Sequence, residues 1–141
     1  MNFYHSLPVQ IRFNDTDPAH HVNNSVYQEY FDLGKVSYFR EVTGQAMNFK
    51  GVSMVVASYK VDFFQPVFLD DTIEVKTRIS VVGTKSIEMV QHLYKIGDPS
   101  PKAISTTIMV CFNYSSQISE ELPADWKEKI RSFEHYECTD K

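Results

Sequence analysis

Apolar and aromatic residues recur at helical spacing in the segment 23–44, NNSVYQEYFDLGKVSYFREVTG. They fall every three or four positions and so share one face of an α-helix; the members of this face are Tyr27, Tyr30, Phe31, Gly34 and Tyr38. Gly44 is expected to end the helix, and its start can be capped by any of three polar residues, Asn23, Asn24 and Ser25. Gly34 costs about 1 kcal/mol relative to Ala in a helix interior. We therefore expect another backbone to approach the helix at Gly34.

Strand patterns flank this helix on both sides. Residues 8–14 (PVQIRFN) alternate Val9, Ile11 and Phe13 with polar neighbours, which is the period of a half-buried strand. After the helix, residues 52–71 are rich in β-branched and aromatic side chains. Pro66 lies within this segment and is expected to mark a bulge, a bend or a strand edge.

Three further segments, at 72–82, 85–96 and 102–114, have the pattern of successive antiparallel strands. Tight turns are expected between them, at Gly83-Thr84 and at 97–101 (GDPSP). In the first of the three segments the alternation assigns four residues to the core face: Ile73, Val75, Ile79 and Val81. In the second it assigns three: Ile87, Met89 and Leu93.

The resulting order of elements, one strand, one long helix and four long strands, is typical of an α+β fold. A chain of 141 residues is expected to form a single domain, 1–141, with its core at about 8–114. Trp126, Ile130 and Phe133 are at helical spacing and predict a short C-terminal helix over 123–135 that covers the sheet. Because one face of the long helix is so aromatic, we expect a curled antiparallel sheet to wrap around it.

Composition and charge narrow the classes of function. The formal net charge of −4 disfavours a protein that wraps duplex nucleic acid, which requires clustered Lys and Arg. No apolar run is long enough to span a bilayer, and the first ten residues lack the pattern of a secretory signal, so we expect no membrane partner. Cys111 and Cys138 have no metal-ligand spacing and are too few for a disulfide framework, which favours the cytoplasm. Cys111 is expected to be a structural residue of its strand, and Cys138 a residue of the tail.

The junction at 13–27 (FNDTDPAHHVNNSVY) concentrates the candidate chemistry, with two acids and two histidines, Asp15, Asp17, His20 and His21. Without further information, turn formation and helix capping explain the acids at least as well as catalysis. A metal site is disfavoured, because adjacent histidines on a loop do not make a closed coordination shell and no second cluster completes one. A serine hydrolase triad is also unsupported, since the chain has no G-x-S-x-G motif.

The stretch IRFNDTDPAHHVNNSVYQEYFD, residues 11–32, resembles the start of the hotdog-fold thioesterases of the 4-hydroxybenzoyl-CoA thioesterase type. In that family a first strand ends in an acid-x-Asp pair, and a short loop then enters the central helix. The later stretch FFQPVFLDDTIEV is similar to the second strand, bend and third strand of the family, so the resemblance covers about residues 8–114. It implies a hotdog fold, hydrolysis of acyl-CoA without a metal or redox cofactor, and a homodimer or homotetramer with sites at the subunit boundary.

The resemblance also assigns site residues. DPA resembles the bacterial CoA thioesterase pattern, which makes Asp17 the catalytic acid, and Asp15 keeps its structural interpretation. HVNN resembles the acyl-carrier-protein thioesterases, which places His21 in the site, although a purely structural role for His21 is equally well supported. Ala19 stands where the plant carrier-protein enzymes have asparagine, so that part of their mechanism does not carry over. Many relatives have glycine at the position of His20; if φ is positive there, histidine is among the better-tolerated substitutes.

The start of the long helix is expected to complete the site. Its first N–H groups are unpaired and carry partial positive charge, so the N–H of Asn24 is the expected oxyanion donor. Asn23 and Tyr27 are expected substrate contacts, although Asn23 is also a good helix cap and core packing is the favoured explanation of the aromatic face that includes Tyr27. Lys85 lies where some relatives bind the CoA phosphates, or it is simply a solvated turn residue.

Two alternatives to an acyl-CoA thioesterase stay open on the sequence, and a third is disfavoured. One is an acyl-carrier-protein thioesterase, which the acidity of this chain disfavours because carrier proteins are themselves acidic. Another is a non-catalytic acyl-binding hotdog protein, which Ala19 and His20 leave possible. The hotdog dehydratases use other acid and base residues, which this sequence lacks. Acyl chain length and the choice between aromatic and aliphatic acyl groups are not encoded in any recognisable pattern.

Overall fold

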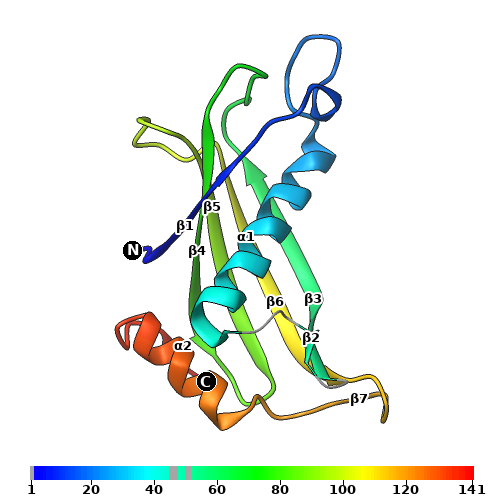
Figure 1. Ribbon diagram of the computed structural model, residues 1–141, viewed down its shortest axis with the longest axis vertical. Helices are drawn as coiled ribbons and strands as arrows, with labels where there is room; N and C mark the ends of the chain where they lie inside the picture. Colours follow the sequence, from blue (N-terminus) through cyan, green and yellow to red (C-terminus); the bar gives the residue numbers. More distant parts are fainter. Residues whose placement is uncertain (1, 45–47, 50–51) are drawn as a thin grey trace.

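The computed structural model describes residues 2–44, 48–49 and 52–141, and it shows a curled antiparallel sheet around one long helix (Figure 1). The expected hotdog arrangement is confirmed. The helix, α1, spans Tyr27–Thr43 and follows directly on a 3-10 turn at Asn24–Val26. A second helix, α2, spans Ala124–Phe133 where the sequence predicts one over 123–135. No helix in the described ranges is both long enough and apolar enough to cross a membrane.

The sheet has the strand order β1-β4-β5-β6-β3-β2, in which β7 also pairs with β6 and β8 with β4. Four long strands follow α1, as predicted; they are β3 (Val52–Phe63), β4 (Ile73–Val82), β5 (Ser86–Lys95) and β6 (Ala103–Asn113). The remaining strands are β1 (His5–Val9), β2 (Asn48–Phe49), β7 (Ile118–Ser119) and β8 (Thr139–Asp140). All pairs are antiparallel except β4 with β8.

The aromatic face of α1 packs into the hollow of the sheet. Its side chains Tyr27, Tyr30, Phe31 and Tyr38 are at most 3% exposed, which confirms the predicted core face. Gly44 ends the helix with φ 75°, in the left-handed region where glycine is favoured, as predicted. The start differs from the prediction, because Asn23 occupies the N-cap position of the 3-10 turn but its side chain makes no capping hydrogen bond.

Gly34 allows a close approach, but of side chains and not of a backbone as predicted. A Cβ at this position would lie 2.8 Å from both Gln91 Nε2 and Val75 Cγ1, and 3.1 Å from Thr77 Oγ1. Gln91 Nε2 donates to the Phe31 carbonyl at 2.8 Å and to Thr77 Oγ1 at 3.0 Å. A buried amide of β5 therefore bridges α1 to β4 in the space that a larger residue at Gly34 would fill.

Two details of the predicted strands are wrong. The first strand is β1, which ends at Val9, so Phe13 is 71% exposed and lies in a 3-10 turn instead of the sheet. In β4, a bulge between Ile79 and Val81 shifts the alternation by one residue, so that Val82 is buried in place of Val81. Both errors arise because an alternating pattern of apolar and polar residues shows neither where a strand ends nor where a bulge interrupts its pairing.

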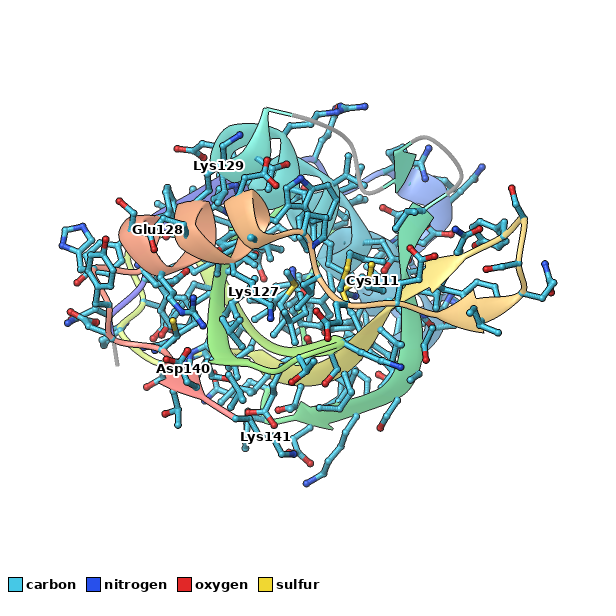
Figure 2. All side chains as sticks on the ribbon, turned by 90° about the horizontal axis from the view of Figure 1, so that it is seen from below. Cys111, Lys127, Glu128, Lys129, Asp140 and Lys141 are labelled. Carbon is cyan, nitrogen blue, oxygen red and sulfur yellow. The ribbon has the colours of Figure 1, made fainter. Side chains whose placement is uncertain are left out.

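Helix α2 covers the lower end of the curled sheet, as the view from below shows (Figure 2). Trp126 and Ile130 are buried and pack with the C-terminal half of α1, where the Trp126 and Phe39 rings lie 6.0 Å apart. Cys111 belongs to the same cluster and is fully buried, consistent with a structural role. This end of the molecule is thus closed by packing.

Glu134 follows α2 and is completely buried. Its Oε1 accepts hydrogen bonds from the Tyr38 hydroxyl at 2.8 Å and from the Ile79 N–H at 3.3 Å. Burial raises the pKa of Glu134, although these two hydrogen bonds and the charge of Arg78 oppose the rise; the charge of Glu137 adds to it. The folded protein therefore binds a proton at Glu134 more tightly than the unfolded chain does.

The expected consequence is a pH-dependent stability difference between the wild type and Glu134→Gln. The contribution of a carboxyl group with a raised pKa is present below its unfolded pKa and is lost as pH rises through the folded pKa. The variant avoids this loss, so its free energy of unfolding relative to wild type should increase from pH 4 to pH 8. The increase is about 1.4 kcal/mol for each unit by which the pKa is raised. Urea unfolding across this range measures it; a difference that stays constant, as expected for exposed Glu121→Gln, would contradict it.

Candidate active site

A pocket of about 640 Å³ lies between the start of α1 and the end of β3. It is lined by five of the six residues that were predicted from the sequence to be catalytic or substrate-binding: Asp17, His21, Asn23, Asn24 and Tyr27. The opposite wall is formed by the chain that leaves β3, with Phe63, Phe64, Gln65 and Pro66. The acid, the histidine and the start of the helix thus meet at one cavity.

The loop that carries Asp17 is a tight turn tied to the segment between β3 and β4. Asp17 N–H donates to the His21 carbonyl at 2.8 Å, and His20 N–H donates to the Asp17 carbonyl at 2.9 Å. His20 has φ 63°, so this position does have the positive φ that glycine in relatives suggests. Val22 N–H donates to the Val67 carbonyl at 2.8 Å, which fixes the loop against the opposite wall.

The Asp17 carboxylate is held through one of its two oxygens. Oδ1 accepts hydrogen bonds from Ala19 N–H at 2.9 Å and from His21 N–H at 3.1 Å. Oδ2 accepts no hydrogen bond from the described residues, and the side chain is only partly buried. One oxygen therefore orients the carboxylate, and the other has lone pairs available to a water or a substrate in the pocket.

The start of the helix supplies donors to the same pocket. Asn23 has φ −60° and ψ 139°, and Val26 N–H donates to its carbonyl at 2.9 Å, which closes the first turn. Within the described residues, the N–H groups of Asn24 and Ser25 donate no hydrogen bond, as expected for the first positions of a helix. These N–H groups and the helix dipole can stabilise negative charge on an oxygen bound here.

His21 lines the pocket and donates its backbone N–H to Asp17, while its ring has a different partner. The ring packs edge-on against Phe68 at 4.7 Å and makes no hydrogen bond in the part of the chain that is described. Tyr27 is 2% exposed, and its ring lies 5.0 Å from that of Phe63. Burial raises the pKa of Tyr27, although a hydrogen bond that its oxygen accepts from the Val67 backbone opposes the rise, so the hydroxyl stays protonated at neutral pH.

Lys85 is not brought to this pocket within one chain. It lies in the turn between β4 and β5, where its carbonyl accepts from Cys111 N–H at 2.8 Å and the neighbouring Thr84 carbonyl accepts from Leu122 N–H. This turn is at the lower end of the sheet, whereas the loop before α1 is at the upper end (Figure 1). A role for Lys85 at the pocket would require a second copy of the chain.

The two acids of the junction point in different directions. Asp15 is 3% exposed and points into the core toward Tyr30, whereas Asp17 lines the pocket. In the ranges 2–44, 48–49 and 52–141, no group of three or more His, Cys, Asp or Glu side chains is placed to hold a metal ion. The structural interpretation of Asp15 and the proposed chemistry of Asp17 are therefore compatible.

Sequence reasoning missed the wall that follows β3. Phe63 and Phe64 are 43% and 58% exposed, although they continue a strand rich in apolar residues. The signal for them was the run FFQP, in which two aromatic residues immediately precede the predicted bend at Pro66. Exposed aromatic side chains beside a bend offer a surface for a ligand, but the sequence did not show which loop they would face.

The sequence is similar to a protein family and to individual proteins of bacteria. A family profile described as the thioesterase-like superfamily matches residues 11–131. Over 88 residues the chain is 26% identical to the Escherichia coli acyl-CoA thioester hydrolase YbgC, a match that covers 61% of this chain and 66% of YbgC. Over 81 residues it is 31% identical to the uncharacterized protein YsmA of Bacillus subtilis, covering 57% of this chain and 54% of YsmA. The chain therefore spans between about half and two thirds of the length of these curated relatives.

A solved structure is similar over nearly the whole chain. It is a thioesterase from Thermus thermophilus in complex with coenzyme A and Zn, with 28% identity and a TM-score of 0.83. The similarity covers 94% of this chain and 96% of that protein. A protein with the same fold as this chain thus binds coenzyme A.

Proposed function

Because the chain belongs to the thioesterase-like superfamily, we propose that it hydrolyses acyl-CoA thioesters to a free carboxylic acid and the CoA thiol. The observation that carries the proposal is the pairing, in one pocket, of an oriented carboxylate and unpaired helix N–H groups. The names of YbgC and of the Thermus thermophilus thioesterase support the same activity. Cys111 and Cys138 are free thiols, which favours a location in the reducing cytoplasm.

In the proposed reaction Asp17 acts through Oδ2. Either it removes a proton from a water that attacks the thioester carbonyl, or it attacks the carbonyl itself and forms a mixed anhydride that water then hydrolyses. In both routes the carbonyl oxygen becomes an oxyanion, and the N–H of Asn24 donates to it. The C–S bond breaks, and the CoA thiolate leaves and takes up a proton. Water supplies the oxygen of the carboxylic acid product.

The remaining pocket residues are assigned to binding. Asn23 and Tyr27 line the pocket beside Asn24, and Phe63 lies against the Tyr27 ring, so an acyl group would contact both walls. His21 holds Asp17 through its backbone N–H, and its ring is the candidate for orienting the attacking water. The proposed hydrolysis uses neither a metal nor a redox cofactor, because Asp17 activates or performs the attack and the Asn24 N–H stabilises the oxyanion.

The principal alternative is an acyl-carrier-protein thioesterase. Carrier proteins are acidic and need a basic rim, but the described residues that line the pocket include no Lys or Arg. Release of free thiol from a panel of short, long, branched and aryl acyl-CoAs tests the proposal, with the same acyl groups on a carrier protein in parallel. We expect turnover of at least one acyl-CoA class in preference to its carrier-protein counterpart. Turnover of carrier thioesters alone, or binding without turnover, would replace the proposal with the corresponding alternative.

We also propose that the chain forms a homodimer through the free edge of β3. On one side β3 pairs with β6 along its length, and on the other the described strand β2 reaches only Val52 and Ser53. An open strand edge is a template for pairing with another chain. In a two-fold pairing of β3 edges, the lower end of one copy lies beside the upper end of the other, the arrangement that Lys85 would need to reach a pocket.

The dimer predicts a particle mass twice the 16.3 kDa of the chain in light scattering. Val56 is 45% exposed on β3, and Val56→Lys should raise the dissociation constant of the dimer by about tenfold, because charged edge residues oppose strand pairing. Leu33→Lys changes a residue on α1 that is 54% exposed, and it should leave the mass unchanged. A monomeric wild type, or equal effects of the two variants, would contradict pairing through β3.

A further inference from the structure

The buried carboxylate of Asp15 is fixed by groups from both sides of the Asp17 loop. Its Oδ2 accepts the Tyr30 hydroxyl at 2.6 Å and the Arg12 N–H at 2.9 Å. Both Asp15 and Tyr30 are 3% exposed. Burial, together with the Asp15 carboxylate, raises the pKa of Tyr30, so the hydroxyl is protonated and can donate at neutral pH. The guanidinium of Arg12 lies 3.6 Å from Oδ1, but it is mostly exposed, so this ion pair contributes little to holding the carboxylate.

The backbone of Asp15 joins the two ends of the same loop. Its carbonyl accepts the Asn23 N–H at 2.9 Å, and the neighbouring Thr16 forms a β-bridge with Val22. The loop from 15 to 23 is therefore closed at Asp15, with Asp17 inside it and Asn24 immediately after it. Through Tyr30, one turn into α1, the closed loop is also bonded to the helix whose first N–H groups line the pocket.

Building on the proposed function, we propose that Asp15 and Tyr30 are positioning residues, which fix the distance between the Asp17 carboxylate and the N–H of Asn24. Neither side chain lines the pocket, so neither is expected to touch the substrate. The reaction needs the attacking group and the oxyanion donor on one carbonyl together, and a misplacement of about 1 Å can reduce the rate by as much as about 100-fold. Among the described residues, the Tyr30 hydroxyl makes the only hydrogen bond between a side chain of this loop and a side chain of α1.

Tyr38 and Glu134 form a similar pair elsewhere on α1, and comparison with this pair distinguishes a positioning role of Tyr30 from a general contribution to stability. Tyr38 donates its hydroxyl to the buried carboxylate of Glu134 at 2.8 Å, near the end of α1 away from the pocket. Tyr30→Phe and Tyr38→Phe each remove one hydroxyl from one buried carboxylate on the same helix. Both variants should therefore lower the melting temperature by similar amounts.

The two variants should differ in turnover and in local exchange. Tyr30→Phe is expected to lower kcat by about 10- to 100-fold with little change in KM, whereas Tyr38→Phe leaves kcat within about twofold of wild type. In native-state hydrogen exchange, amides in residues 16–26 should exchange at least about tenfold faster in Tyr30→Phe and at the wild-type rate in Tyr38→Phe. The same comparison applies to Asp15→Asn against Glu134→Gln if Tyr30→Phe does not fold.

The exchange measurement does not depend on activity, so it separates the two proposals. Wild type without turnover of any thioester would overturn the proposed function, while faster exchange confined to Tyr30→Phe would still show that the pair holds the loop. Equal exchange in residues 16–26 for the two Tyr variants would overturn the positioning role. Equal losses of kcat in Tyr30→Phe and Tyr38→Phe would also overturn it, because stability alone would then explain both.

Discussion

The Asp17→Asn variant is expected to lose about 10²- to 10⁴-fold in kcat for the best acyl-CoA substrate, the range that a general base typically contributes. The amide oxygen of Asn can still accept the N–H groups of Ala19 and His21, so the loop should keep its shape. The amide nitrogen that replaces Oδ2 can neither remove a proton nor attack a carbonyl. KM should change much less than kcat, because the lost interaction belongs to the transition state.

Thiol release at saturating substrate measures this loss directly. Asp70→Asn is the matched control, since Asp70 is an exposed acid in the segment between β3 and β4 and is expected to contribute nothing to turnover. A normal kcat for Asp17→Asn would remove Asp17 from the reaction. A loss of the same size in Asp70→Asn would point to a general effect of charge on substrate binding.

Gly34→Ala is expected to destabilise the folded protein by about 1–3 kcal/mol, the usual cost of overpacking a well-packed core. A Cβ would lie 2.8 Å from both Gln91 Nε2 and Val75 Cγ1, and moving Gln91 would strain its bond to the Phe31 carbonyl. The gain in helix propensity, up to about 1 kcal/mol, offsets only part of this cost. Urea unfolding of the variant gives the change in the free energy of unfolding.

A double-mutant cycle identifies the cause. Val75→Ala removes one of the two atoms nearest to the new Cβ, so the double variant with Gly34→Ala should be more stable than the sum of the single changes predicts. Gln28→Ala, on the exposed side of α1, should change stability by no more than about 0.5 kcal/mol. A neutral or stabilising Gly34→Ala would show that the side chains around Gly34 move aside freely.

Local patterns were sufficient for the main elements of the fold. The aromatic spacing from Tyr27 to Tyr38 identified the buried face of α1, because a helix enclosed by a sheet must be apolar on that face. Alternation identified the core residues of β5, Ile87, Met89 and Leu93, correctly. It was wrong where the ladder itself is irregular, at the bulge before Val81 and at the end of β1. Those features depend on the partner strand, which a local pattern does not contain.

The candidate site was predictable in its loop and not in its surroundings. Asp17, His21 and Asn24 lie close together in sequence, so any compact loop before α1 brings them to one place. The wall from Phe63 to Pro66 joins them only because the end of β3 and the start of α1 lie at the same end of the molecule, which is a consequence of topology. Lys85 was assigned from a resemblance, and one chain places its turn at the other end of the sheet.

In the proposed reaction the thioester is cleaved in the pocket between the start of α1 and the end of β3. A crystal structure with a thioether or ketone analogue of an acyl-CoA substrate tests it most directly. We predict that the carbonyl oxygen of the ketone, or its hydrated form, lies within about 2.7–3.2 Å of the Asn24 nitrogen. Asp17 Oδ2 should face the carbonyl carbon in the same complex. An analogue bound with its carbonyl outside this pocket, or turned away from both groups, would contradict the account.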